Sequence, residues 1–212
     1  MPLISVQRRS SGDPEAARSH LAAAVPHAGR IGHRQIGPLE LARSLDCEYS
    51  GAPQEALAAL TAAFASHTQD LGEIEDLLGD AVRLAIQAGD HETAKALTGH
   101  ADALATGSDI AHRQANALYC HALLNLDAPR LLIAADRYGT AGRPLRQAMA
   151  LEAASRHFAD SGEKTRARAA FTAAEDIYTS LGATADITRL QAEFRTATSG
   201  TGHAQTPARI HS

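Results

Sequence analysis

The chain contains little of several residue types on which common protein functions depend. It has 212 residues, of which only 4% are aromatic, and it has no tryptophan. A formal net charge of -4 argues against a protein that grips nucleic acid by bulk positive charge, so we expect no direct nucleic-acid binding. Cys47 and Cys120 lie far apart in the sequence, and we expect both to be reduced structural thiols.

Long apolar segments and ligand-binding motifs are missing as well. No window contains 18 apolar residues, and the first ten residues lack the apolar core of a signal peptide, so we expect a cytoplasmic protein without membrane contact. The sequence contains no Gly-x-x-x-x-Gly-Lys-Ser/Thr phosphate loop. None of the 11 histidines stands four residues from another, the spacing that pairs imidazoles on one helix face. We therefore expect neither a cofactor nor a metal site.

The stretch Ala88-Gly89-Asp90 carries the clearest structural signal. A helical pattern runs up to Gly89, and another leaves from Asp90. Glycine is suited to the left-handed residue just beyond a helix end, and aspartate is a favoured N-cap of the next helix. The stretch is therefore predicted to be the tight turn of a helical hairpin.

Similar turns recur along the chain at a nearly constant period. They begin at residues 12, 51, 89, 126 and 162, so the successive separations are 39, 38, 37 and 36. A period in this range marks stacked helical hairpins. Small residues recur after most turns, but the unit after Leu126-Asp127 departs from the pattern. Its turn lacks glycine, and Leu131 and Tyr138 stand where small residues are expected.

The predicted fold class is all-α, built from stacked antiparallel helical hairpins in one domain that covers residues 1–197. A first, incomplete hairpin is expected to end near Gly29, and residues 198–212 are expected to form a disordered tail. Between them we expect helices at about 38–49, 53–66, 71–87, 91–105, 110–125, 128–139, 143–160, 164–180 and 184–197.

The small-large-small pattern after most of the turns resembles the second helix of the tetratricopeptide repeat, and this resemblance implies a right-handed superhelix. The stretch from Ala150-Leu151-Glu152 to Leu181-Gly182-Ala183 resembles the C-terminal repeats of actinobacterial LuxR-type transcriptional regulators. Those regulators place an ATPase domain before the repeats and a helix-turn-helix domain after them. This sequence has neither the phosphate loop nor residues for the second domain after position 197. The resemblance therefore implies only the sensor or partner-binding portion, with a regulatory role.

In such a stack, the first helix of each hairpin lines a concave groove. The residues 13, 10 and 6 positions before each turn are predicted to face it. This register also places five less polar residues on the inner surface, namely Pro38, Leu41, Leu45, Gly79 and Met149. The chemically informative residues of the predicted groove are Asp76, Arg83, Arg113, Asn116, Cys120, Glu152 and Arg156.

The favoured hypothesis is a binding module that holds a protein partner or a small anionic ligand, because arginine captures carboxylate or phosphate in a bidentate manner. Alternatively, Arg83, Arg113 and Arg156 pair across neighbouring repeats with the carboxylates of Asp76, Glu152 and Asp160. Cys120 is then a small semi-buried apolar residue. A second hypothesis is a small metabolic enzyme that uses the groove as its active site, although no catalytic residues stand at a diagnostic spacing. A third is a remnant of a larger regulator that acts as a homodimer.

Overall fold

The computed structural model describes residues 22–23, 36–66 and 75–199. Regular structure in this part of the chain is entirely helical, with nine α-helices and one short 3-10 helix. The all-α prediction is therefore confirmed. The predicted first hairpin, up to Gly29, and nearly all of the predicted tail lie outside the described residues.

The helix bounds agree closely with those predicted from the sequence. The prediction of one helix over 71–87 was partly wrong, because its described part divides into a 3-10 turn and an α-helix. The elements are α3 (Ile36–Tyr49), α4 (Pro53–Ser66), η4 (Glu75–Leu77), α5 (Leu78–Gln87), α6 (His91–Ala105), α7 (Ala111–Leu124), α8 (Ala128–Thr140), α9 (Pro144–Asp160), α10 (Lys164–Ser180) and α11 (Thr184–Ser199).

The hairpin turns within the described residues form as their sequences predict, with one exception. Gly89 has a φ of 75°, and the Asp90 side chain accepts a hydrogen bond from the backbone N–H of Thr93 at 3.0 Å. Asp127 caps α8 in the same way. The residue before it, Leu126, adopts a φ of 53°, and it is the one non-glycine residue with positive φ in the described chain. A left-handed leucine is strained, because its Cβ crowds the backbone.

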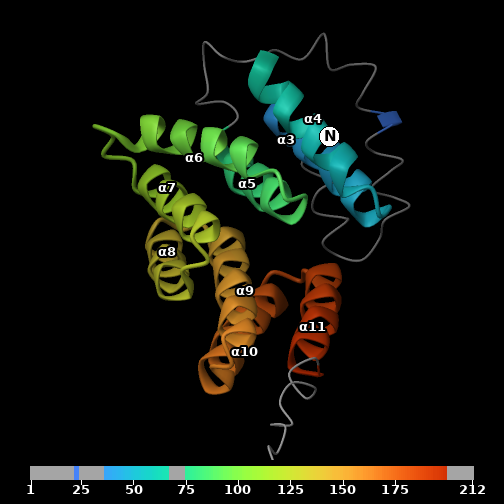
Figure 1. The fold of residues 1–212 in the computed structure, drawn as a ribbon, viewed down its shortest axis with the longest axis vertical. Coiled ribbons are helices and arrows are strands. Elements are labelled where there is room, and N and C mark those ends of the chain that lie inside the picture. The colour runs from blue at the N-terminus through green and yellow to red at the C-terminus, as the bar shows by residue number, and fades with distance from the viewer. Residues whose placement is uncertain (1–21, 24–35, 67–74, 200–212) are drawn as a thin grey trace, which may run out of the picture.

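The helices follow one another around an open arc, with the α3–α4 hairpin at one end and α11 at the other (Figure 1). Each helix packs mainly against the helices before and after it, and α5 also contacts α7, as α9 contacts α11. Fully buried alanines such as Ala94 and Ala167 let the two helices of a hairpin approach closely. None of the helices in the described ranges has both the length and the apolar character needed to cross a membrane.

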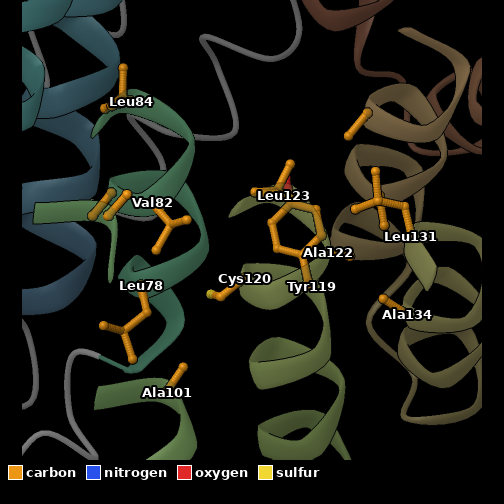
Figure 2. Close-up of a cluster of buried hydrophobic side chains, with 14 of the residues drawn as sticks. Leu78, Val82, Leu84, Ala101, Tyr119, Cys120, Ala122, Leu123, Leu131 and Ala134 are labelled. Atoms are coloured by element: carbon orange, nitrogen blue, oxygen red, sulfur yellow. The ribbon is translucent and has the colours of Figure 1, made fainter. Parts of the chain in front are cut away.

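The hydrophobic core runs along the arc between the helices. Val82 of α5 points toward α7, whose Tyr119 and Leu123 belong to the same cluster as Val82 and Leu78. The cluster continues to Leu131 of α8 (Figure 2). A second, smaller cluster joins α9, α10 and α11. This continuous core holds the first helices of successive hairpins in place around the inner side of the arc.

Candidate functional site

The inner side of the arc contains a cavity of about 160 Å³, which we call the central cavity. Its lining comes from five helices, α3, α5, α7, α9 and α11, which are the alternate helices of the chain. Within the described residues, the intervening helices contribute none of the lining. The hairpin register therefore decides which helix of each pair faces the cavity.

The lining combines apolar surface with equal numbers of opposite charges. Its apolar and aromatic members are Leu41, Leu45, Tyr49, Tyr119, Leu123, Leu145, Met149 and Ala153. Its ionisable members are Glu48, Asp80, Arg83, Arg146, Glu152, Arg156, His157, Asp186 and Arg189. Four arginines thus face four carboxylates, so the described lining is close to neutral.

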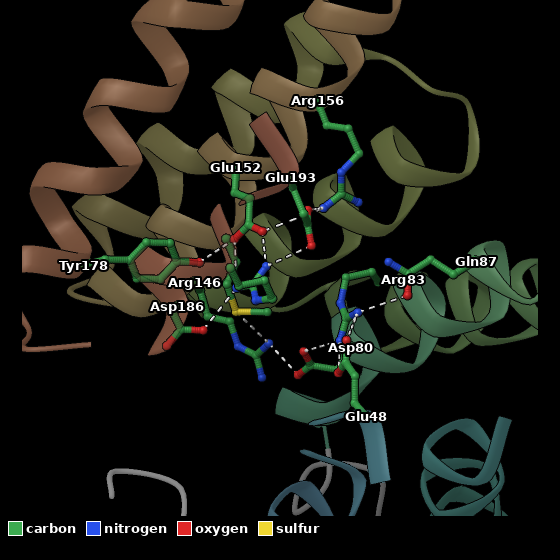
Figure 3. A network of polar contacts seen from close by, with 12 residues as sticks. Glu48, Asp80, Arg83, Gln87, Arg146, Glu152, Arg156, Tyr178, Asp186 and Glu193 are labelled. Atoms are coloured by element: carbon green, nitrogen blue, oxygen red, sulfur yellow. Dashed lines mark hydrogen bonds and ion pairs between the residues drawn. The ribbon is translucent and has the colours of Figure 1, made fainter. Parts of the chain in front are cut away.

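The first group of charges links α3, α5 and α9. Arg83 donates two hydrogen bonds to the carboxylate of Glu48, at 2.6 and 2.8 Å, and lies 3.8 Å from Asp80 (Figure 3). Asp80 in turn accepts from Arg146 of α9 at 2.7 Å. Arg146 also donates to the backbone carbonyl of Asp76. These contacts tie together helices that belong to three different hairpins.

Burial and pairing act in opposite directions on these arginines. Burial alone would lower the pKa of Arg83, but the hydrogen bond to Glu48 and its negative charge raise that pKa above its ordinary value. Burial would also lower the pKa of Arg146, and the charge of Asp80 is the largest effect that raises it instead. Both arginines therefore remain charged and held by carboxylates.

The second group of charges links α9, α10 and α11. Glu152 is only 6% exposed and accepts hydrogen bonds from both terminal nitrogens of Arg189, one of them at 3.1 Å, and from the Tyr178 hydroxyl at 2.7 Å. Arg156 donates to Glu193 and lies 3.7 Å from Glu152 (Figure 3). Burial would raise the pKa of Glu152, but the charge of Arg189 and these hydrogen bonds lower it below its ordinary value.

His157 adds one group that titrates near neutrality. Burial and the charge of Arg156 lower the pKa of its imidazole below the ordinary value. The side chain is therefore neutral at pH 7. The imidazole makes no hydrogen bond within the described residues, so it is a polar group of the lining without a described side-chain partner.

Comparison of the chain with models of protein families, with curated proteins and with solved structures found no match. The function therefore has to be argued from the cavity itself. Within the described ranges, no group of three or more His, Cys, Asp or Glu side chains is arranged to hold a metal ion.

Three of the seven residues predicted for the groove line the central cavity. They are Arg83, Glu152 and Arg156. Asp76 lies outside it, and its exposed carboxylate accepts from Arg143 at 3.3 Å. Arg113 also lies outside, where its Nε atom donates to Glu75 at 2.6 Å.

The remaining two predicted residues are buried in the interior. The Asn116 amide donates to the backbone carbonyl of Glu75 at 3.0 Å and accepts from the Tyr138 hydroxyl at 2.9 Å. Cys120 is fully buried, and burial raises the pKa of its thiol to about 12. Its neighbour Tyr119 lines the cavity instead. The groove register predicted for α7 is therefore corrected by about one residue.

The physical reason for this correction lies in the contact between α7 and α5. A Cβ atom on Gly79 would lie 3.0 Å from Cε1 of Tyr119, so the glycine makes room for the aromatic ring. Tyr119 also packs edge-to-face against Tyr138, with ring centroids 6.1 Å apart. The ring occupies the space on the cavity side, and the smaller Cys120 turns into the core.

Sequence reasoning missed most of the charged partners in the lining. Arg146 stands three residues before Met149, a spacing that places both on one face of α9, so the signal was present. Asp186 and Arg189 were missed because α11 has no following turn from which to count. Glu48 was missed because it lies three residues after Leu45, the last position that the register counts before this turn.

Proposed function

We propose that this chain is a tetratricopeptide-like binding module whose central cavity holds a small molecule with an apolar body. The observation that carries the proposal is the convergence of five alternate helices on one cavity with leucine, methionine and alanine in its lining. Ligand sites in proteins are typically concave, mostly apolar and supplied with a few placed polar groups. We further propose a regulatory role, on the strength of the resemblance to regulator repeats.

The charges of the cavity favour a ligand other than an anion. Arg83, Arg146 and Arg189 each hold a carboxylate within hydrogen-bond distance. An anion would have to displace one of these carboxylates, which would then be left buried without its partner. Removing one member of a buried pair is strongly unfavourable. We therefore place the apolar residues, and not the arginines, at the centre of ligand binding.

An enzymatic function would need a nucleophile or an acid–base pair that is free to act on the ligand. The carboxylate of Glu152 is occupied by Arg189 and Tyr178, and the thiol of Cys120 lies outside the cavity lining. Ligand binding does not require either group to be released from these positions, so we prefer binding to catalysis.

The chain offers a selective probe for this proposal. It contains two methionines, Met1 and Met149, and Met149 lines the cavity. In protein labelled with methyl-13C methionine, the NMR methyl signal that disappears in the Met149→Leu variant is that of Met149, and the other belongs to Met1. Titration with acetophenone, a small neutral aromatic, is expected to shift the Met149 methyl signal in a saturable way.

Two matched variants test where the probe binds. Ala153→Met fills part of the cavity and is expected to abolish the saturable shift, because Ala153 is in the lining. Ala169→Met adds the same side chain at an exposed position of α10 and should leave the titration unchanged. A wild-type protein without a saturable shift, or an Ala153→Met variant that binds as well as wild type, would contradict the proposal.

A further inference from the structure

The hydroxyl group of Tyr119 is a buried polar group that has no hydrogen-bond partner in the part of the chain that the structure describes. Tyr119 is only 2% exposed and lies in the lining of the central cavity. Its ring contacts Gly79 and Tyr138, but within the described residues its hydroxyl makes no hydrogen bond. Buried tyrosine hydroxyls usually form a hydrogen bond, so a buried hydroxyl without a described hydrogen bond is unusual.

The other three tyrosines do not share this property. The hydroxyl of Tyr138 donates to Asn116, and that of Tyr178 donates to Glu152. Tyr49 is not without an interaction partner, and it is 40% exposed, so it is not a buried tyrosine. Among the tyrosines of the described residues, Tyr119 alone combines burial, a place in the cavity lining and a hydroxyl without a described hydrogen bond.

The surroundings of Tyr119 keep its hydroxyl protonated. Burial raises the pKa of Tyr119 well above its ordinary value, and the positive charge of Arg83 offsets only part of this effect. The group is therefore a neutral O–H donor. Arg83, Asp80 and Arg146 act electrostatically on it, but none of their described hydrogen bonds goes to this hydroxyl. Arg83 donates to Glu48 and Gln87, and Arg146 donates to Asp80, to the Asp76 carbonyl and to the Met149 sulfur.

We propose that the ligand of the central cavity is an uncharged molecule with an apolar body and one oxygen acceptor, and that Tyr119 donates a hydrogen bond to this oxygen. The inference rests on the proposed function and specifies the ligand class. The apolar body packs on residues such as Leu123, Leu145 and Met149. The acceptor is a carbonyl, ether or hydroxyl oxygen.

The charge balance of the cavity supports an uncharged ligand. Four arginines and four carboxylates of the described lining already compensate one another. A ligand with a net charge would bring one more charge into this partly buried space without a free partner. Burying an unpaired charge costs several kcal/mol, far more than one hydrogen bond returns.

The depth of Tyr119 supports a small molecule as the source of the acceptor. Because the side chain is 2% exposed, an acceptor reaches its hydroxyl only by entering the cavity. A cavity of about 160 Å³ admits a compact ring with a short polar substituent.

Four aromatic probes separate these requirements, with the Met149 methyl signal as the readout. Acetophenone carries a carbonyl acceptor, ethylbenzene lacks it, and benzoate and benzylamine add a negative or a positive charge. Tyr119→Phe removes the hydroxyl and retains the ring. Tyr138→Phe is the matched control, because its hydroxyl donates to Asn116 and does not line the cavity.

We expect Tyr119→Phe to raise the Kd for acetophenone by about 3- to 10-fold, the effect of one hydrogen bond. The Kd for ethylbenzene should stay equal or fall. Tyr138→Phe should leave the Kd values for both acetophenone and ethylbenzene unchanged. Benzoate and benzylamine should each bind to the wild-type protein at least about tenfold more weakly than acetophenone.

The outcomes distinguish this inference from the proposed function. If none of the four probes shifts the Met149 signal of the wild-type protein, both fail. If acetophenone and ethylbenzene bind but Tyr119→Phe alters their Kd values equally, the hydrogen bond is refuted while the binding module stands. If benzoate or benzylamine binds more tightly than acetophenone, the uncharged class of ligand is overturned.

Discussion

The ion pair between Asp80 and Arg146 joins α5 to α9, two helices that lie two hairpins apart in the chain. Their nitrogen–oxygen distance is 2.7 Å, and only 5% of the Asp80 side chain and 14% of the Arg146 side chain are exposed. We predict that this pair contributes measurable coupling to the free energy of unfolding. The variants Asp80→Leu, Arg146→Met and the double variant form the test.

The expected magnitudes follow from what each change leaves behind. Asp80→Leu leaves Arg146 buried without a carboxylate in hydrogen-bond contact, with the Asp76 carbonyl and the Met149 sulfur as its described acceptors, so we expect a loss of about 3–5 kcal/mol. Arg146→Met leaves Asp80 still 3.8 Å from Arg83, so its cost should be smaller, about 2–3 kcal/mol. The double variant leaves neither member of the pair alone. Its loss should fall short of the sum by about 2–3 kcal/mol.

Urea unfolding followed by far-UV circular dichroism at pH 7 and 25 °C measures these free energies. Equal m-values among the variants would show that they unfold from equivalent states. The exposed pair Glu92–Lys95 on α6 is the control, and its coupling should not exceed about 0.5 kcal/mol. A coupling between Asp80 and Arg146 as small as that of the control would refute the reasoning.

Three further changes test other parts of the structure. Leu126→Gly should raise the melting temperature, with a gain of about 1 kcal/mol, because φ is positive and the side chain is 63% exposed; a lower melting temperature would contradict this. Gly79→Ala should lower the free energy of unfolding by about 1–3 kcal/mol, because the added Cβ would crowd the Tyr119 ring. Gly99→Ala, in open space on α6, is the control and should be neutral or stabilising by up to about 1 kcal/mol. Equal effects of the two variants on urea unfolding would count against the crowding. Because the pKa of Glu152 is lowered in the folded protein, its ionised carboxylate stabilises the fold above the unfolded-state pKa of about 4.3, and this stabilisation is lost as the pH falls below that value. Glu152→Gln should therefore flatten the fall in the free energy of unfolding between about pH 5 and 3. An unchanged slope would show that Glu152 does not cause this fall.

The helices could be predicted from the sequence because their ends are determined locally. Gly89 with Asp90, and Gly162 with Glu163, each end one helix and begin the next within two residues. The cavity-facing side of α9 could be predicted for the same reason. Met149, Glu152 and Arg156 lie at fixed distances before a regular glycine turn, and all three line the central cavity.

The cavity-facing side of α7 could not be read from the same rule. Its following turn contains Leu126 in place of glycine, and the orientation of Tyr119 depends on contacts with Gly79 and Tyr138 on two other helices. Asn116, which lies on α7 as Tyr119 does, accepts the hydrogen bond of the Tyr138 hydroxyl. Such contacts join residues that no local pattern connects.

The sequence by itself determined the all-helical class, the hairpin period and the helix ends, because these depend on residues within one turn of each other. The tertiary structure decided which charges meet, such as Glu48 with Arg83 or Glu152 with Arg189, since each pair spans more than 30 residues. It also decided that the arginines are held by carboxylates and that Tyr119 lines the cavity. Side chains from distant hairpins meet only after the helices pack, so the chemistry of the cavity is a property of the fold.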